Sequence, residues 1–335
     1  AVCNEAVKLA KRHKFAQLSG FVNGVLRNIA RNIDSVQFDT LSIRYSMPQW
    51  IVDRFVAAYG EKKAEEIFKA FHNKSTISIR TNLTRCTPDE LRTMLEAEGV
   101  TVTAVDELDY AFVISGFDYL NGLQSFRDGL FYVQDISSML VAQTAVPKKG
   151  DYVIDVCAAP GGKSTHIAEL LQGSGHVLAR DLTDNKVDMI EENIERHGLN
   201  NMSAEVWDAT VPDADSAGKA DILICDLPCS GLGVLGRKKD IRYKMTPESV
   251  DELAALQRQI LDTVHTYVKP NGVLVYSTCT IDEAENEDNV RWFIEKHLEF
   301  ELDKNFAEGT GMKQILPGEH GSDGFFIARF IKSKL

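Results

Sequence analysis

The sequence predicts an α/β protein built on a doubly wound, mostly parallel sheet, with a small α+β domain and a helical segment before it. Three observations support this prediction. Strands and helices alternate from residue 151 onward. A glycine-rich turn at 155–163 ends the first of these strands, and cysteine-bearing segments at 226–229 and 277–279 end two later ones. Because ligands bind beyond the carboxyl ends of parallel strands, we expect the turn and both thiols to face one crevice.

The first 40 residues predict two helices and a polar linker. Apolar residues recur at helical spacing in 4–12 and 21–29, and polar residues follow through about Thr40. The chain does not begin with Met and helical character starts at once, so we expect further sequence before Ala1. Residues 1–60 contain eight Lys or Arg and four acids, a balance of +4, which leaves -16 of the total of -12 for the remainder. A basic front is compatible with RNA binding and equally with a solvated surface.

Residues 41–145 predict a small α+β domain. Gly60 separates two helical segments, alternating residues then indicate a strand, and Pro88 and Gly99 bound a further helix. β-prone residues return in two later runs. In chain order the expected elements are helices at 49–59 and 62–71, a strand at 76–83, a helix at 88–98, and strands at 100–105 and 111–115.

Residues 146–335 predict the doubly wound domain. Each apolar, β-prone run is followed by a segment with helical spacing, which indicates βαβ units and a parallel sheet with right-handed crossovers. The expected strand and helix pairs are 152–156 with 164–171, 176–179 with 185–197, 221–225 with 247–267, and 272–276 with 284–297, and a last strand covers 325–330.

The composition is that of an ordinary globular chain of 335 residues, 44% of them hydrophobic. No apolar run approaches the roughly 20 residues that a membrane span needs, and no charged-then-apolar leader opens the chain, so we expect a cytoplasmic protein. The six cysteines form no Cys-x-x-Cys pair and no histidine couple stands nearby at ligand spacing, which argues against structural zinc and disulfides. We expect no bound metal, structural or surface roles for the histidines, and a monomeric chain.

The glycine-rich turn is the best-defined cofactor signal. Gly161 and Gly162 allow close backbone approach, and the helix that follows offers unpaired N–H groups and a positive dipole end. A P-loop is disfavoured, because Cys157 stands where that pattern needs glycine and Pro160 removes a donor.

Two acids follow the next two strands. Asp181 stands 20 residues after Gly161, where an acid can accept both hydroxyls of a ribose, and Asp208 could accept from an adenine amino group. Their order on successive strands favours an adenosine site over two solvated loop acids.

A dinucleotide fingerprint at 231–236 lacks the apolar helix that must follow it. We interpret its continuation as a flexible basic loop beside Cys229. Its cations could meet a phosphate backbone while Tyr243 stacks on a base. The five cations of this basic loop are Arg237, Lys238, Lys239, Arg242 and Lys244.

Cysteines at strand ends are candidates for chemistry, although a lone cysteine is usually a small core residue. Pro228 fixes the backbone before Cys229. The acid-rich stretch 282–287, expected to start a helix, follows Cys279. The cysteines that fit the inert class better are Cys157 and Cys225.

These motifs resemble the cofactor and two-cysteine motifs of Sun/Fmu-type RNA cytosine-C5 methyltransferases. The resemblance rests on Asp-Val-Cys-Ala-Ala-Pro-Gly-Gly-Lys at 155–163, Asp-Leu-Pro-Cys-Ser-Gly at 226–231 and Ser-Thr-Cys at 277–279. One departure is Leu227, where Ala is more usual.

The resemblance extends to both ends of the chain. Residues 21–27 are similar to the end of the NusB-like RNA-binding domain that precedes catalysis in bacterial members acting on small-subunit ribosomal RNA. Segments 134–138 and 323–326 also fit the family. The N-terminal domain is abbreviated by comparison.

The resemblance implies three domains: a helical remnant of a NusB-like domain at 1–40, a small RNA-binding or linker domain at 41–145, and a Rossmann-like S-adenosylmethionine-dependent domain at 146–335. It also implies methyl transfer from S-adenosylmethionine to C5 of a cytosine in RNA, expected to be 16S ribosomal RNA. The implied cofactor contacts are Cys157, Ala158, Ala159, Pro160, Gly161, Gly162, Lys163, Asp181, Asp208 and Asp226.

Cytosine C5 is too weak a nucleophile to take a methyl group from a sulfonium unaided, whereas a thiolate added at C6 turns C5 into an enamine carbon. By resemblance Cys279 is that nucleophile and Cys229 assists product release, while Asp226 or Lys163 holds the base or supplies charge near N3. The target base must leave its stack or lie in a loop, which suits unpaired ribosomal RNA.

Three alternatives stay open on sequence alone. The two cysteines are not ranked, because the Pro-Cys thiol attacks in DNA cytosine methyltransferases. The chain could itself act on DNA. It could also be a ribosomal RNA binding or assembly factor that keeps a vestigial cofactor pocket.

Overall fold

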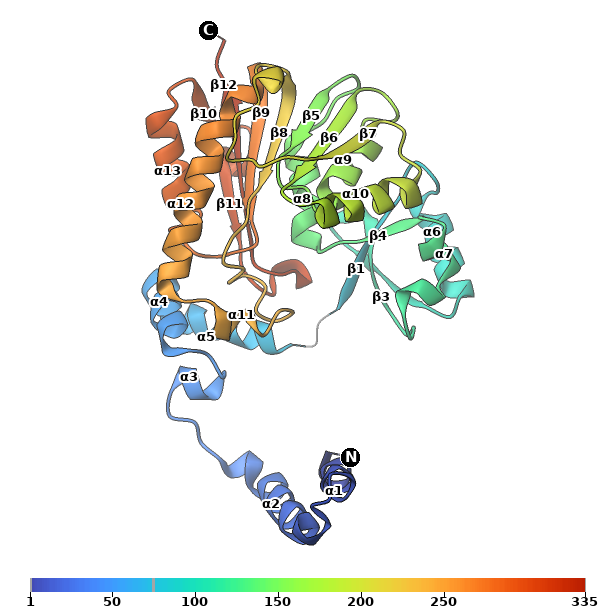
Figure 1. Ribbon diagram of the computed structural model, residues 1–335, viewed down its shortest axis with the longest axis vertical. Helices are drawn as coiled ribbons and strands as arrows, with labels where there is room; N and C mark the ends of the chain where they lie inside the picture. Colours follow the sequence, from blue (N-terminus) through green and yellow to red (C-terminus); the bar gives the residue numbers. More distant parts are fainter. Residues whose placement is uncertain (1, 74–75, 335) are drawn as a thin grey trace. The chain divides into compact units, whose positions relative to one another are not determined.

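The chain forms two compact units, residues 1–52 and 53–335, and the boundary lies within helix α4 (Gln49–Tyr59). The structure is a computed structural model that describes residues 2–73 and 76–334 (Figure 1). Within those ranges, none of the helices combines the length and the apolar character that a membrane span requires.

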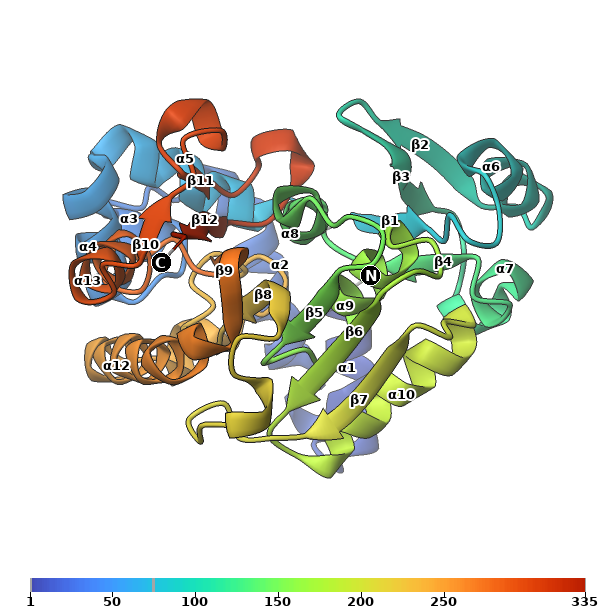
Figure 2. The ribbon, with the colours of Figure 1, turned by 90° about the horizontal axis from the view of Figure 1, so that it is seen from above.

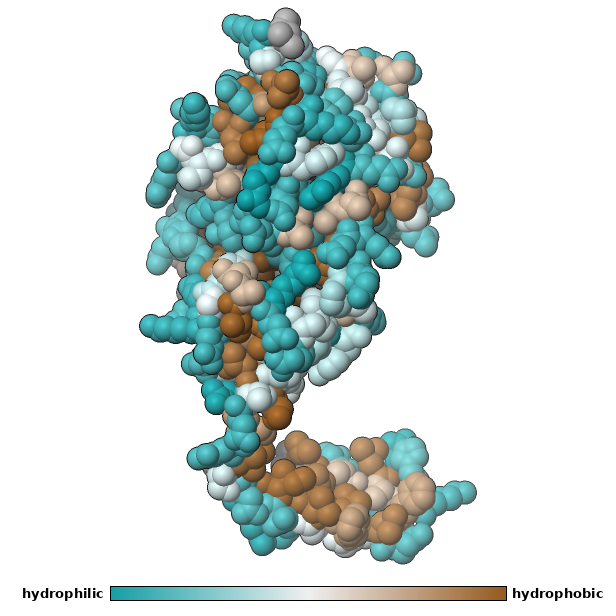
Figure 3. Space-filling view, turned by 90° about the vertical axis from the view of Figure 1, so that its left-hand side faces the viewer, coloured by the Kyte–Doolittle hydropathy of each residue, from teal (hydrophilic) through white to brown (hydrophobic). Residues whose placement is uncertain are grey.

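The first unit is helical, and both helices expected there are confirmed. Helices α1 and α2 pack on each other, and neither contains a buried residue. Apolar side chains such as Phe15, Phe21 and Ile29 are therefore exposed on the surface of this segment (Figure 3). The elements are α1 (Val2–Arg12), η1 (Ala16–Leu18), α2 (Ser19–Asn32), η2 (Ile33–Ser35) and α3 (Leu41–Arg44).

The second unit begins with a small four-stranded sheet in the order β2-β3-β1-β4, and every neighbouring pair is antiparallel. Helix α6 starts at a capping box, because the Thr87 side chain accepts from the Glu90 N–H while Glu90 accepts from the Thr87 N–H. Ile79, Leu95 and Phe131 lie in the shared core. The elements are α5 (Glu61–His72), β1 (Ile77–Thr81), α6 (Pro88–Ala97), β2 (Thr101–Val105), β3 (Leu108–Ser115), η3 (Leu120–Gly122), α7 (Gln124–Arg127) and β4 (Phe131–Val133).

The large sheet has the order β10-β12-β9-β8-β5-β6-β7, with β11 paired to β12. Strands β5 to β9 are parallel to their neighbours in this group, whereas β10, β11 and β12 pair antiparallel. The predicted doubly wound, mostly parallel sheet is thus confirmed. The strands are β5 (Tyr152–Asp155), β6 (His176–Asp181), β7 (Met202–Val206), β8 (Ala220–Asp226), β9 (Val268–Thr278), β10 (Phe300–Leu302), β11 (Met312–Ile315) and β12 (Phe325–Lys332).

Helices cover both faces of this sheet, because alternate strand residues point to opposite sides. Val153 packs with α8, α9 and α10, whereas Ile154 packs with α12 and α13. Seen from above, β9, β8, β5, β6 and β7 lie side by side in this order (Figure 2). The helical elements are α8 (Ile136–Ala145), α9 (Gly162–Leu170), α10 (Asp184–His197), η4 (Ala214–Ser216), α11 (Ile241–Lys244), α12 (Pro247–Val264), η5 (His265–Tyr267), α13 (Glu287–Lys296), η6 (Ala307–Gly309) and η7 (Glu319–Gly321).

Strands β4, β10 and β11 and helices α7 and α8 were not among the elements expected from the sequence, and two further details differ. Helix α13 starts at Glu287 rather than at 284, because the side chains of Glu285 and Asn286 turn inward and are buried. Helix α8 packs in the core of the large sheet, although the division at 145/146 assigned it to the small domain. The domain bounds themselves stay a prediction.

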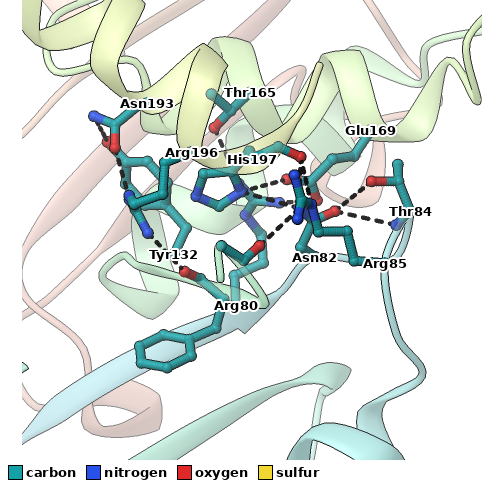
Figure 4. Close-up of polar contacts among 12 residues, drawn as sticks. Arg80, Asn82, Thr84, Arg85, Tyr132, Thr165, Glu169, Asn193, Arg196 and His197 are labelled. Atoms are coloured by element: carbon teal, nitrogen blue, oxygen red, sulfur yellow. Dashed lines mark hydrogen bonds and ion pairs between the residues drawn. The ribbon is translucent and has the colours of Figure 1, made fainter. Parts of the chain in front are cut away.

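A buried polar cluster joins the small sheet to the large one (Figure 4). Arg80 of β1 forms an ion pair with Glu169 of α9, and both side chains are only 1% exposed. The guanidinium also donates to Gln134 Oε1 at 3.0 Å and to Thr165 Oγ1 at 3.1 Å. Asn82 donates to the His197 carbonyl at 3.2 Å. Because charges this deeply buried must be paired, this cluster fixes how the small sheet sits on α9 and α10.

Candidate active site at the strand ends of the large sheet

The predicted cofactor turn lies between β5 and α9. Gly161 adopts a φ of +102°, which favours glycine, and a side chain on Gly162 would meet the Tyr132 ring at 3.1 Å. Asp155, at the end of β5, is buried and accepts from the Ser164 hydroxyl and the Cys157 N–H. Burial raises the pKa of Asp155 to about 7, and the neighbouring Asp226 adds to this rise. The glycine-rich turn therefore leaves its backbone open to a close ligand beside the N-terminus of α9.

Asp181, at the end of β6, is hydrogen-bonded to the same turn. Its carboxylate accepts from the Ala159 N–H at 2.9 Å and the Leu182 N–H at 2.7 Å, and it pairs with Lys186 at 2.7 Å. Asp208, after β7, is exposed and accepts from Thr210. Acceptors on successive strand ends beside a helix N-terminus suit an adenosine with an anionic tail, so these residues fit the expected cofactor.

Lys163 and Asp226 connect the cofactor turn to the end of β8. Lys163 Nζ lies 2.6 Å from Asp226 Oδ2, and Ser277 donates to Asp226 Oδ1 at 2.7 Å. Burial lowers the pKa of Lys163, but the Asp226 carboxylate outweighs burial and the net pKa is raised. The ammonium also lies 5.3 Å from the centre of the Phe325 ring. The site thus holds a fixed positive charge next to an anchored carboxylate.

The two predicted thiols meet at this edge. Cys229 Sγ and Cys279 Sγ are 3.2 Å apart, and both residues are partly exposed. The hydrogen bond from Cys229 lowers the pKa of Cys279, and Lys163 and Lys238 act in the same direction. The same contact, with burial, raises the pKa of Cys229. The pair therefore favours a thiolate at Cys279 and a thiol at Cys229.

Two further cysteines lie at strand ends without such surroundings. Cys225 is fully buried, and burial raises its pKa well above the ordinary value. Cys157 is partly exposed in the cofactor turn, and burial together with nearby carboxylates, Asp155 first, raises its pKa. Neither environment favours a thiolate.

The five cations of the basic loop differ in exposure and in their contacts within the protein. Lys238, Lys239 and Lys244 are exposed, and Tyr243 is 72% exposed. Arg242 is only 5% exposed and donates to the Leu235 carbonyl at 3.3 Å. The expectation that Arg242 meets RNA at the surface therefore does not fit the structure. It packs beneath the loop because α11 turns this side chain inward.

The first cation of the loop, Arg237, has a side chain that is 31% exposed and already bound within the protein. Its guanidinium pairs with Asp135 at 2.8 Å and with Asp323, and it donates to the Thr76 carbonyl at 3.0 Å. Burial raises the pKa of Asp323 to about 6, and Asp135 adds to this rise. Arg237 thus anchors the start of the basic loop.

The structure also brings together two histidines that are 32 positions apart in the chain. Asp262, His265 and His297 place one possible ligand atom each within 4.8 Å of one another. Lys296 Nζ already lies 2.8 Å from Asp262 Oδ1, and His297 Nε2 lies 3.3 Å from the same oxygen. We interpret this group as a charged contact between α12 and α13, which the sequence could not show.

Sequence reasoning missed the side chains that hold the two thiol segments together. Glu285, Ser230 and Gln257 are all buried, and Ser230 and Gln257 both donate to the Glu285 carboxylate. The acid-rich stretch 282–287 was the available signal, but the sequence predicted only that this stretch starts a helix. Only the tertiary contacts show that Glu285 holds the residue that follows Cys229.

Together, the doubly wound sheet, the glycine turn after its first strand and the acids after the next two define a Rossmann-like methyltransferase of the S-adenosylmethionine-dependent class. The family model described as "16S rRNA methyltransferase RsmB/F" matches residues 142–331. Models of the RsmF/B-like ferredoxin-like domain and of the NusB family match residues 47–117 and 1–31. The chain belongs to the RsmB/F family of 16S rRNA methyltransferases, and the resemblance seen in the sequence is confirmed.

Individual relatives agree with this assignment. The chain is 38% identical to "Probable ribosomal RNA small subunit methyltransferase B" of Bacillus subtilis (strain 168), over 99% of this chain and 78% of that protein. A methyltransferase homolog protein from Pyrococcus horikoshii has 26% identity and a TM-score of 0.73 over 87% of this chain and 97% of that one. NSun6 from the same organism, solved with the S-adenosylmethionine analogue SFG, has 24% identity and a TM-score of 0.77, and covers 86% and 99%. The predicted cofactor, S-adenosylmethionine, is confirmed for the family.

Proposed function

We propose that the protein transfers a methyl group from S-adenosylmethionine to C5 of a cytosine in RNA, with 16S ribosomal RNA as the substrate. The single observation that carries this proposal is the thiol pair. Cys279 Sγ lies 3.2 Å from Cys229 Sγ at the strand ends that also hold Lys163 and Asp226. Two thiols beside a methyltransferase cofactor turn suit a reaction in which one sulfur activates the base and the other assists its release.

Cys279 is the proposed nucleophile. Its thiolate forms a bond to C6, and the electrons of the C5=C6 bond make C5 an enamine carbon that takes the methyl group. The bound cofactor supplies that methyl group from its sulfonium. Loss of the C5 proton to a base then reforms the C5=C6 bond while the C6–S bond breaks, and the electron pair returns to Cys279. Cys229 lies within contact of this sulfur and is the proposed aid to elimination.

Lys163 and Asp226 are the proposed contacts for the cytosine ring near N3. Asp226 is held on both sides, by Lys163 at 2.6 Å and by Ser277 at 2.7 Å, so its carboxylate has a fixed position. A preorganised carboxylate and ammonium can orient the base and stabilise charge that develops on the ring. The cofactor is proposed to lie along the glycine turn, with its carboxylate at the start of α9 and its ribose at Asp181.

RNA is proposed to approach over the basic loop. Lys238, Lys239 and Lys244 offer phosphate contacts, and the exposed ring of Tyr243 offers a stacking surface. Arg237 and Arg242 are left out of the five cations expected from the sequence, because both are held within the folded protein, whereas the pair that Lys244 forms with Asp240 is exposed.

The test is methyl transfer from labelled S-adenosylmethionine to 16S RNA by cysteine variants. Cys279→Ser should lose at least about 10³-fold in rate, as expected when a nucleophile is removed. Cys229→Ser should transfer once and remain on the RNA as a covalent adduct visible in a denaturing gel. Cys3→Ser, which removes a thiol of α1, should behave as wild type.

Three outcomes would contradict the proposal. Near wild-type transfer by Cys279→Ser would remove its assigned role, and free turnover by Cys229→Ser would remove the release role. Bisulfite mapping of RNA and DNA after reaction identifies the methylated base, and a product that is not 5-methylcytosine in RNA would overturn the proposed reaction.

A further inference from the structure

The segment after Cys279 carries a buried acid with no role in the proposed chemistry. Glu285 is fully buried, in a stretch that the sequence predicted only as the start of a helix. It precedes α13, which begins at Glu287. A buried carboxylate is costly unless its oxygens are hydrogen-bonded, so its partners indicate what it does.

The partners of Glu285 flank Cys229. Glu285 Oε1 accepts from the Ser230 N–H at 2.8 Å and from Gln257 Nε2 at 3.0 Å, and Oε2 accepts from the Ser230 hydroxyl. Gln257 Nε2 also lies 2.8 Å from the Pro228 carbonyl. One carboxylate therefore holds the residues on both sides of Cys229, directly at Ser230 and through Gln257 at Pro228.

Ser230 also reaches the other thiol segment. Its hydroxyl lies 2.9 Å from Thr280 Oγ1, and Thr280 directly follows Cys279. The backbone repeats the connection, because the Gly233 N–H donates to the Cys279 carbonyl at 3.1 Å. Glu285 and Ser230 thus fix the separation of the two sulfurs from behind the site.

The charged groups around the two thiols differ, because those that act on Cys279 include two cations and the one that acts on Cys229 is a carboxylate. Cys279 faces Lys163, Lys238 and Asp226, whereas Cys229 faces Glu285 and the phenol of Tyr276. The ionisable neighbours of Glu285 itself are Asp282, Arg54, Tyr276 and Cys229. Negative charge at Glu285 disfavours a thiolate on Cys229 and leaves the ammonium groups to favour one on Cys279.

We propose that Glu285 is a positioning residue for the thiol pair: it holds Cys229 against Cys279 and keeps the shared proton on Cys229. The proposal deepens the proposed function and rests on it for its catalytic meaning. It adds that residues of α12 and of the segment before α13, rather than those of the cofactor turn, determine which of the two cysteines carries the proton.

The first test needs neither RNA nor cofactor. Iodoacetamide labelling of each cysteine, followed by mass spectrometry from pH 6 to 10, reports which thiol ionises. In the wild type Cys279 should react at lower pH than Cys229. In Glu285→Gln, which keeps the size of the side chain, the ratio of the two labelling rates at pH 8 should fall about tenfold, the effect of one pKa unit.

The matched control is Glu283→Gln, which removes the same charge two residues away from a side chain that is 61% exposed. It should leave the labelling ratio unchanged. An unchanged ratio in folded Glu285→Gln would overturn the proposal, and so would an equal change in Glu283→Gln. If Glu285→Gln does not fold, Ser230→Ala removes one contact with less disturbance, and the same ratio should fall by a smaller factor. An unchanged ratio in Ser230→Ala would then overturn it.

The second test is methyl transfer. Glu285→Gln should lower kcat about 10- to 100-fold with little change in KM for RNA, and the pH profile of kcat should shift. A general loss of structure would lower the fraction of active enzyme but would leave the pH profile of kcat unchanged. Glu285→Asp, which keeps the charge, should recover part of the rate. If the wild type transfers no methyl group to RNA, the proposed function fails, and the labelling result still decides whether Glu285 orders the two thiols.

Discussion

Two polar clusters in the second unit each contain an ion pair and differ in how far that pair is exposed to solvent. In the buried polar cluster, Arg80 and Glu169 are 1% exposed and the guanidinium has three side-chain partners. At the strand ends, Lys163 and Asp226 form an ion pair as well, but their side chains are 14% and 26% exposed and lie beside two thiols. The first cluster is closed, whereas the second is accessible to a ligand.

This difference separates a structural role from a chemical one. A fully buried pair cannot receive a substrate, and removing one partner leaves an uncompensated charge, so the cluster acts on stability. The strand-end groups have access to solvent and asymmetric surroundings, which shift their pKa values in opposite directions. Changes in the first region should therefore alter unfolding, and changes in the second should alter binding and rate.

The largest effect on stability should come from breaking the buried pair. Glu169→Ala should lower the free energy of unfolding by about 3–5 kcal/mol, because Arg80 is left buried and unpaired. Chemical denaturation measures this decrease. The exposed pair of Lys244 and Asp240 is the control, and Asp240→Ala should cost far less stability, because an exposed pair is solvated and screened. Equal costs would remove the distinction between the two kinds of cluster.

The next effect concerns the pH dependence of stability at Asp155. Its pKa is raised to about 7, so between about pH 4 and 7 the folded state keeps a proton that the unfolded state has lost. The free energy of unfolding should therefore fall as pH rises through this window, by at most about 4 kcal/mol at 1.36 kcal/mol per pKa unit. Asp155→Asn should flatten the fall, whereas the exposed Asp188→Asn should not. An unchanged slope in Asp155→Asn would show that other groups cause it.

A smaller effect is expected on cofactor affinity. Asp181→Asn should weaken S-adenosylmethionine binding about 10- to 100-fold, the range expected when a hydrogen bond to a charged group is removed. Calorimetric titration measures it. Asp184→Asn changes an exposed neighbour at the start of α10 and should bind as the wild type does. Wild-type affinity in Asp181→Asn would exclude a ribose contact at this position.

The smallest effect should be on how steeply RNA affinity depends on salt concentration. Replacing Lys238, Lys239 and Lys244 by Gln should reduce the slope of log affinity against log salt by about 0.7 for each phosphate of single-stranded RNA that the protein no longer neutralises. Binding titrations at several salt concentrations give this slope. Lys219→Gln changes an exposed cation outside the basic loop and should leave the slope as it is. A slope that the triple variant does not change would place the RNA elsewhere.

Much of the fold was predictable because local patterns agree with it. Helix α4 has the bounds that the sequence predicted, and β6, β8 and β12 each contain the strand expected for them. The strand-end motifs were also predictable from local sequence, since a glycine pair before a helix and a Pro-Cys dipeptide are recognised without a distant partner. Arg242 was not predictable in the same way, because a cation in a basic loop looks alike whether its side chain points out or in.

Spacing over a few residues was enough to locate the cofactor turn, the cysteines that follow β8 and β9, and most strands and helices of the large sheet. Which side chains meet depends instead on how distant segments pack. The tertiary structure placed Cys229 and Cys279 in contact across 50 positions, turned Glu285 inward behind them and buried Arg80 against Glu169. Contacts of this kind depend on sheet order and helix packing, which short-range periodicity does not encode.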